Sequence, residues 1–142
     1  MTTSEDLLRT LRTWHKLPAR QMLERLDISR ATLMRAVRGL GPQVVARGRA
    51  RRTAYAARCA LWGRLQVLLL YRIDAAGQAH AVATLFRVYP AGCTLDGSEP
   101  LGWPLDADMQ DGWFEGLPYF PDDMRPQGFL GRHFSQHHAG LL

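Results

Sequence analysis

The first forty residues place apolar side chains at three- and four-residue spacing in three successive blocks. This period predicts helices over residues 4–14, 18–26 and 29–40. Thr3 and Ser29 are suited to cap the first and third helices, because a hydroxyl side chain can accept a hydrogen bond from a free helical N–H. Pro18 suits the first turn of the second helix, and Gly41 with Pro42 ends the third.

Two short strands follow, at Val44–Val45 and at Thr53–Ala57. The loop between them contains Gly48 and a concentration of arginines, which indicates a basic hairpin. Three helices followed by such a hairpin predict a winged helix-turn-helix over residues 1–60. In that fold the last helix reads the major groove of double-stranded DNA.

After residue 60 the pattern changes to that of strands. Residues 65–73 and 79–89 flank a turn at Gly77, and the apolar run Leu65–Tyr71 predicts a buried strand. Residues 90–104 are rich in glycine and proline and predict loops, while helices are expected near residues 108–116 and 128–138. The predicted fold class is α+β: a winged helix-turn-helix followed by a small mixed α+β module, residues 61–142, with an antiparallel hairpin.

Charge divides the 142-residue chain at the same place as the hydrophobic pattern. The net charge of +5 combines a basic first part and an acidic second part. Residues 1–60 carry thirteen basic and four acidic side chains, a net charge of +9, whereas residues 61–142 carry five and nine, a net charge of −4. A basic module of this kind indicates a nucleic-acid partner.

The third helix carries its charge on one side. Leu33, Val37 and Leu40 share the apolar face, which leaves polar side chains on the other. We expect base contacts from the first two turns of this helix and phosphate contacts from the hairpin, the alternative being a solvated cationic surface. The predicted DNA-binding residues are Ser29, Arg30, Thr32, Arg35, Arg38, Arg47, Arg49, Arg51 and Arg52.

Two resemblances add to this interpretation. The segment ARQMLERLDISRATLMRAVRGL, Ala19–Leu40, resembles the helix-turn-helix of bacterial regulators, with Asp27 where that pattern often has glycine. The segments LWGRLQVLLLYRIDAAGQAHAVATLFRVYPAG, residues 61–92, and WFEGLPYFPDDMRPQGFLGRHF, residues 113–134, resemble the N-terminal subdomain of HipA-family toxins. The most specific part is LPYFPDDMRPQGFLGR. Members of that family are serine/threonine kinases whose nucleotide and catalytic motifs lie downstream of this subdomain.

No catalytic motif is found in the sequence. It contains no GxSxG nucleophile setting, no phosphate-binding glycine loop and no kinase lysine–aspartate–asparagine set. We therefore expect no enzymatic activity from this chain and no cofactor. His133 and His137 share a helical spacing but lack companion ligands, so no metal site is expected. The acidic residues between Asp106 and Asp123 predict a solvated face or a docking surface for a basic partner, which includes the arginine-rich hairpin of the same chain.

Cys59 and Cys93 lack metal or redox spacing and are expected to be free thiols. The N-terminus has no basic and apolar secretory signal, and no apolar stretch reaches the roughly 18 residues of a membrane helix. We expect a cytoplasmic protein with no membrane contact.

Most aromatic side chains of the second module are expected to lie in its core, because aromatics supply much of the burial available to a small module. The resemblance implies that this module packs against a kinase core, so some of them are expected to form an exposed interface instead. The predicted partner-binding residues are Trp113, Phe114, Tyr119 and Phe120. The favoured hypothesis is a DNA-binding regulator and antitoxin that binds its operator and a HipA-like kinase toxin. The alternatives are a non-catalytic N-terminal portion of such a toxin, and a plain winged-helix transcription factor whose second module forms a homodimer or senses a ligand.

Overall fold

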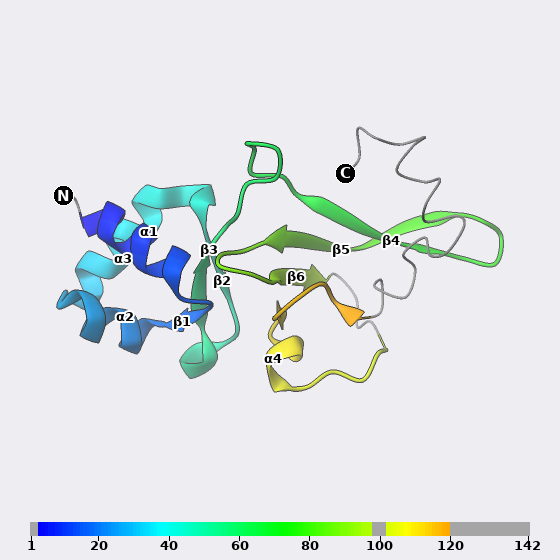
Figure 1. Cartoon of the computed structure of the whole chain (residues 1–142). Coiled ribbons are helices and arrows are strands. Elements are labelled where there is room, and N and C mark those ends of the chain that lie inside the picture. Colours follow the sequence, from blue (N-terminus) through cyan, green and yellow to red (C-terminus); the bar gives the residue numbers. More distant parts are fainter. Residues whose placement is uncertain (1–2, 98–101, 120–142) are drawn as a thin grey trace.

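A computed structural model describes residues 3–97 and 102–119, which form a mixed α+β structure with two antiparallel sheets. The predicted α+β class is confirmed. Figure 1 shows three helices at one end of the molecule and a long hairpin extending from the other end. A small three-stranded sheet lies next to the helices, and the hairpin is part of a larger four-stranded sheet.

The three N-terminal helices begin and end close to the predicted positions: α1 spans Thr3–Thr13, α2 Ala19–Leu26 and α3 Arg30–Leu40. Ser29 caps α3 as expected, because the backbone N–H of Thr32 donates to its Oγ over 3.2 Å. Asp27 ends α2 in the left-handed conformation at φ +48°. Aspartate tolerates this conformation better than most residues, so the turn forms without glycine. The helices enclose a core centred on Leu7, Leu11, Met22 and Leu33.

The smaller sheet has the strand order β1–β3–β2 and is antiparallel throughout. Its strands are β1 Leu17–Pro18, β2 Val44–Arg47 and β3 Ala54–Ala57. Short 3-10 turns lie before β2, at Gly41–Gln43, and before β3, at Ala50–Arg52. Gly48 adopts φ +96°, and a Cβ there would collide with the carbonyl of Arg52. The tight return from β2 to β3 therefore requires glycine at this position.

The larger sheet has the order β4–β5–β6–β7, all antiparallel. Its strands are β4 Leu68–Ile73, β5 Ala79–Arg87, β6 Cys93–Gly97 and β7 Trp113–Phe114. Two predictions were wrong here: β6 lies within the expected loop, and the helix expected over residues 108–116 is the single turn α4, Ala107–Gln110, followed by β7. Gly112, at φ +90°, ends the helical turn, and its carbonyl accepts from the N–H of Leu95 over 2.8 Å.

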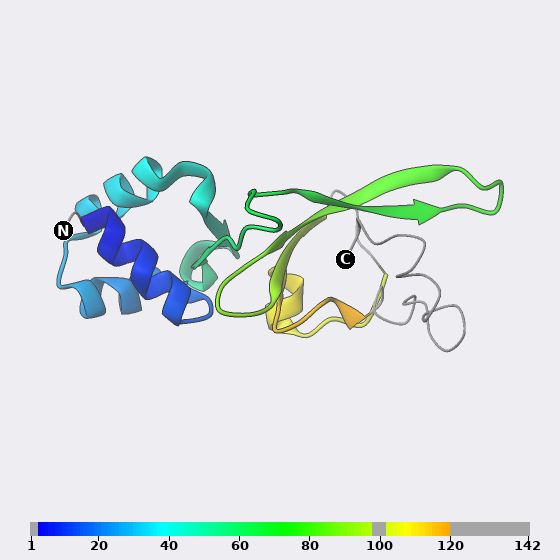
Figure 2. The same cartoon turned by 45° about the horizontal axis from the view of Figure 1, so that its top comes forward.

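Strand β4 is exposed, although its apolar sequence predicted a buried strand. Of its six residues only Leu70 is partly buried, where it packs beside the core of the larger sheet. The reason is its place in the fold, since β4 is the edge strand of a hairpin that projects from the body (Figure 2). An apolar run in a sequence cannot distinguish an edge strand from a central one. The helix expected near residues 128–138 lies outside the described residues.

Strand β3 is buried on both faces and connects the two sheets. Tyr55 and Ala57 face the helical core, whereas Ala54 and Ala56 pack with Val45, Val88, Trp113 and Phe86. We call this second cluster the junction. Hydrogen bonds continue past the end of β3, from Tyr89 N–H to the carbonyl of Ala57 and from Cys59 N–H to the carbonyl of Arg87. Residues on either side of position 60 therefore share one buried contact surface.

We predict that the same substitution destabilises the protein much more in the core than on β4. Leu11 is fully buried and Leu69 is 53% exposed. Leu11→Ala should lower the free energy of unfolding by about 2–5 kcal/mol, because it leaves a cavity, and Leu69→Ala by less than about 1 kcal/mol. Urea unfolding followed by circular dichroism measures both. A large loss for Leu69→Ala would contradict the exposure of β4.

Candidate nucleic-acid interface

The outer face of α3 carries the predicted base-contacting residues. Arg30, Arg35 and Arg38 are exposed, and within residues 3–97 and 102–119 none of them forms an ion pair. At the start of the helix, the hydroxyl oxygens of Ser29 and Thr32 lie 2.9 Å apart and share a hydrogen bond. Ser29, Arg30 and Thr32 therefore lie at the N-terminal turn of α3, where free backbone N–H groups favour anions.

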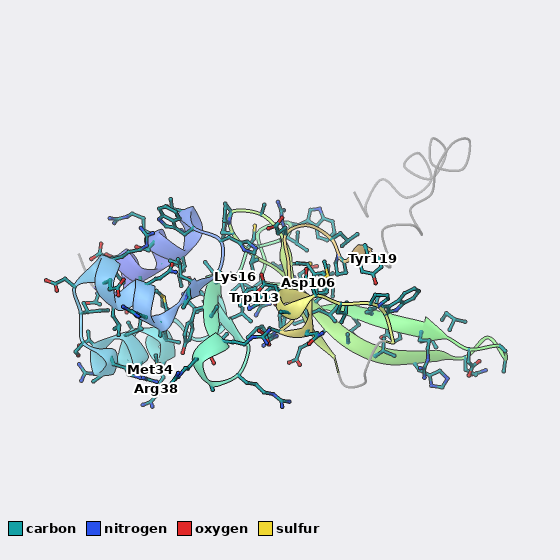
Figure 3. All side chains as sticks on the ribbon, turned by 90° about the horizontal axis from the view of Figure 1, so that it is seen from below. Lys16, Met34, Arg38, Asp106, Trp113 and Tyr119 are labelled. Atoms are coloured by element: carbon teal, nitrogen blue, oxygen red, sulfur yellow. The ribbon has the colours of Figure 1, made fainter. Side chains whose placement is uncertain are left out.

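This face points away from the second half of the chain. Figure 3 shows Met34 and Arg38 at the far side of the helical end, whereas Lys16 and Trp113 lie together near the junction. The inner face of α3 is covered by the core, where Leu33, Ala36 and Leu40 are buried. Arg30, Arg35 and Arg38 are thus exposed from the first turn of α3 to its last.

The four hairpin arginines fall into two pairs. Arg49 and Arg51 are exposed in the connection between β2 and β3. Arg47 instead lies 3.6 Å from Asp96 and over the ring of Phe86, and its side chain is largely buried. Because Arg47 is engaged at the junction, it presents little charge to an external phosphate.

Arg52 is also engaged with the second half of the chain. Its guanidinium lies 2.7 Å from the carboxylate of Asp111 and donates to the carbonyl of Ala107. Lys16 adds a third ion pair of this kind, 2.6 Å from Asp108. Asp108 and Asp111 belong to the acidic stretch that was expected to be a solvated face or to bind a basic partner. In the structure, basic side chains of the first half of the same chain bind these two carboxylates. The predicted DNA-binding set is therefore reduced to the residues that remain unpaired.

The predicted partner-binding aromatic residues differ in their exposure. Trp113 and Phe114 are each 3% exposed, because β7 lies between the junction and the core of the larger sheet. Their side chains offer no surface to a partner, so the expected contact through these two residues has to be corrected. Tyr119 is exposed, and its hydroxyl donates to the carbonyl of Pro104 over 2.8 Å. Phe120 lies outside the described residues.

Arg58 was not singled out by the sequence, yet it holds three segments together. Its guanidinium donates to the carbonyls of Pro42 and Gln66 and lies 4.2 Å from the centre of the Phe86 ring. Burial, together with the nearby charge of Arg47, lowers the pKa of Arg58 from its ordinary value. The sequence does not distinguish Arg58 from the other arginines near it. Its hydrogen-bond partners are backbone carbonyls, which every residue has, and they come from other segments of the chain.

His15 is the other polar group at the edge of the junction. Its ring lies edge-on to Trp113, with the ring centres 6.2 Å apart, and its Nε2 is buried without a hydrogen-bond partner among the described residues. Burial, and to a lesser extent the charge of Lys16, lowers the pKa of His15. A proton on His15 would therefore be bound more weakly in the folded chain than in the unfolded one.

The described part of the chain was also searched for a metal-binding group and for reactive cysteines. Its histidines, cysteines and carboxylates form no group of three or more that could hold a metal ion. Cys59 and Cys93 are free thiols, as expected. Burial raises the pKa of Cys93 to about 12, and its thiol donates to the carbonyl of Gly116. Among the described helices, none has the length and apolar character required to cross a membrane.

Comparison with known proteins links the second half of the chain to a toxin family. A family model described as "YjjJ-like toxin, middle domain" matches residues 63–142. The protein named "Toxin YjjJ" of Escherichia coli (strain K12) is 36% identical over 125 residues, which cover 87% of this chain and 26% of that protein. The chain thus spans about a quarter of the length of this relative. No solved structure matches the chain significantly.

The buried histidine predicts a pH dependence of stability. The ordinary pKa of histidine is 6.5, and that of folded His15 is lower. As the pH falls below about 6.5, the unfolded chain binds a proton that the folded chain does not, so the free energy of unfolding decreases. In His15→Gln this contribution is absent. We therefore expect the wild-type chain to lose more stability than the variant between about pH 7 and pH 5.

Urea unfolding of both chains at a series of pH values measures the difference. Above about pH 7.5 His15 is neutral in both states, so the difference between the two chains should there be constant. Parallel curves over the whole range would show that His15 titrates equally in the folded and unfolded chains.

Proposed function

The chain belongs to the YjjJ-like toxin middle-domain family, and on this premise we propose that it is a DNA-binding regulator of a toxin–antitoxin system. In this proposal residues 1–60 form a winged helix-turn-helix that binds operator DNA. The second part, residues 61–142, contacts a HipA-like kinase toxin. The observation that carries the proposal is the exposed outer face of α3, whose arginines form no ion pair with the described residues, together with the exposed Arg49 and Arg51 of the β2–β3 connection.

The order of elements supports a winged helix. Helix α2 and helix α3 are joined by a three-residue turn, and the hairpin β2–β3 follows directly. In the helix-turn-helix class the second helix of the pair enters the major groove. Here that helix is α3, and its exposed arginines form no ion pair with the other described residues. The hairpin occupies the position of the wing.

The side chains on this surface fit the two kinds of contact that DNA offers. Arg30 lies in the first turn of α3, the part of a recognition helix that approaches base edges. A guanidinium there can donate two hydrogen bonds to guanine, which discriminates this base from the others by about 1–3 kcal/mol. Arg49 and Arg51 do not lie on the recognition helix. In this proposal they supply positive charge for contacts with the phosphate backbone. Specificity would therefore come from α3 and affinity from the hairpin.

Two arrangements of the kinase partner fit the family. The kinase core is either a separate polypeptide, in which case this chain acts as antitoxin, or part of the same protein, in which case this chain is the DNA-binding portion of a toxin. The second arrangement is favoured by the match to about a quarter of Toxin YjjJ. In both, the present residues carry no catalytic motif and contribute binding. Copurification with a separately encoded kinase core would support the first arrangement.

We predict that two arginines affect DNA binding in different ways. A preferred duplex is first selected from a random pool with the wild-type chain. Arg30→Ala should reduce the preference for this duplex over an unrelated one by about tenfold, because a base contact is lost. Arg51→Ala should weaken binding to both duplexes equally and lower the slope of log K against log salt by about 0.9, because one phosphate contact is lost. Fluorescence anisotropy at several salt concentrations measures each quantity.

Two matched variants serve as controls. Arg52→Ala removes an arginine from the same connection that is already paired with Asp111, so the salt slope should change by less than half of the effect of Arg51→Ala. Arg87→Ala removes an exposed charge from β5, in the other part of the chain, and should leave both affinities unchanged. If the wild-type chain bound no duplex at low salt, the proposal would fail.

A further inference from the structure

Carboxylates of the second half hold two of the four hairpin arginines, but the two ion pairs differ in their surroundings. Arg47 pairs with Asp96, and only 19% of the Arg47 side chain is exposed, so this pair belongs to the junction. Arg52 pairs with Asp111, and 54% of the Arg52 side chain is exposed. Arg52 is therefore a surface arginine, and a carboxylate of the other half compensates its charge.

Helix α4 and the residue that ends it supply the groups that hold Arg52. Its Nη2 atom lies 2.7 Å from the carboxylate of Asp111 and donates to the carbonyl of Ala107. On the same turn, Asp108 lies 2.6 Å from Nζ of Lys16. The turn is thus attached to the first half of the chain through both basic side chains, and Figure 1 shows α4 close to the β2–β3 connection. A guanidinium with a charged and a neutral acceptor is held more firmly than one in a single exposed ion pair.

The position of Asp111 is fixed by the larger sheet rather than by Arg52. Asp106 caps α4, because its carboxylate accepts from the backbone N–H of Met109 over 2.8 Å. Directly after Asp111, the carbonyl of Gly112 accepts from the N–H of Leu95 over 2.8 Å. A Cβ on Gly112 would collide with the carbonyl of Leu95, so this approach is close. The carboxylate of Asp111 is therefore presented to the β2–β3 connection by a segment with its own anchors.

This contact lies where the proposed function places the DNA backbone. Arg52 follows Arg51 directly in the chain, and consecutive Cα atoms are only about 3.8 Å apart. A phosphate backbone that binds at Arg49 and Arg51 therefore passes close to Arg52. Because Arg52 is already paired, it gains little from a phosphate unless Asp111 is first displaced.

We propose that α4 together with Asp111 is an autoinhibitory element, which occupies Arg52 and so keeps the affinity for DNA below that of the unoccupied hairpin. The inference rests on the DNA-binding part of the proposed function and adds its regulation. The coupling is reciprocal: separation of α4 from Arg52 strengthens DNA binding by the same factor by which DNA favours the separation. An ion pair with a solely structural role would stabilise the fold and leave the affinity for DNA unchanged.

The test uses the full chain and the duplex selected with the wild type. Asp111→Asn keeps the size of the side chain and removes the charge that holds Arg52. We expect its affinity for the duplex to rise at least about threefold at about 0.1 M salt, because one arginine becomes available to a phosphate. For the same reason the slope of log K against log salt should become steeper by about 0.9. Fluorescence anisotropy measures both quantities.

Two further variants separate the release of Arg52 from the mere loss of a negative charge. Asp111→Asn/Arg52→Ala should bind the duplex no more tightly than Arg52→Ala, because there is no arginine to release. Asp106→Asn removes the same charge at the other end of α4, where no ion pair with a described residue is formed. Asparagine caps a helix about as well as aspartate. Its gain in log affinity should be less than half of that of Asp111→Asn.

A measurement on the wild-type chain tests the same inference without any substitution. The side-chain Nε–H signals of Arg51 and Arg52 are recorded by NMR during titration with the duplex. In the wild type the signal of Arg51 should shift, and that of Arg52 should stay nearly unchanged. In Asp111→Asn both signals should shift.

Three results would overturn the inference while the wild type still binds DNA, and these leave the proposed function in place. The first is equal affinity of the wild type and Asp111→Asn, and the second is a gain that persists in Asp111→Asn/Arg52→Ala. The third is a shift of Arg52 as large as that of Arg51 in the wild type. Absence of DNA binding by the wild type and by every variant would instead contradict the proposed function, and the inference with it.

Discussion

The burial of β3 on both faces is the constraint on which the rest of the structure depends. Its four residues alternate between the helical core and the junction, and three of them are alanines. Small side chains allow the helices on one side and Trp113 on the other to approach the same strand closely. Larger residues at Ala54 or Ala56 would separate the two halves. Because β3 holds both, the direction in which α3 presents its exposed face is fixed relative to the second sheet.

The opposite charges of the two halves contribute to the same contact. Lys16, Arg47 and Arg52 pair with carboxylates from the second half. The net charge of +9 on residues 1–60 therefore overstates what is available to an external partner. Arg30, Arg35 and Arg38 on the outer side of α3 and Arg49 and Arg51 in the β2–β3 connection are exposed and form no ion pair with the described residues. In the proposed function these arginines are the ones available to DNA, because their positive charge attracts its phosphates.

The sequence predicted the helices well and the second sheet less well, for physical reasons. The apolar residues of α1, α2 and α3 recur with a strong helical period. The cap at Ser29 and the turn at Asp27 depend on residues close by in the sequence, so both could be predicted. Strand β7 has only two residues and no period of its own, and Trp113 is buried by contacts distant along the chain. Likewise, the pairing of Arg52 with Asp111 and the exposure of Leu69 depend on topology. The amino-acid composition of these segments therefore predicted neither the ion pair of Arg52 nor the exposure of Leu69.

The central claim is that α3 contacts DNA through its exposed face while the junction stays closed. Amide chemical shifts of the full chain, recorded during titration with a selected duplex, test it most directly. The account predicts the largest shifts at residues 29–38 and 49–51, with Lys16 and Trp113 nearly unchanged. Shifts concentrated in residues 61–119, with α3 unaffected, would contradict it.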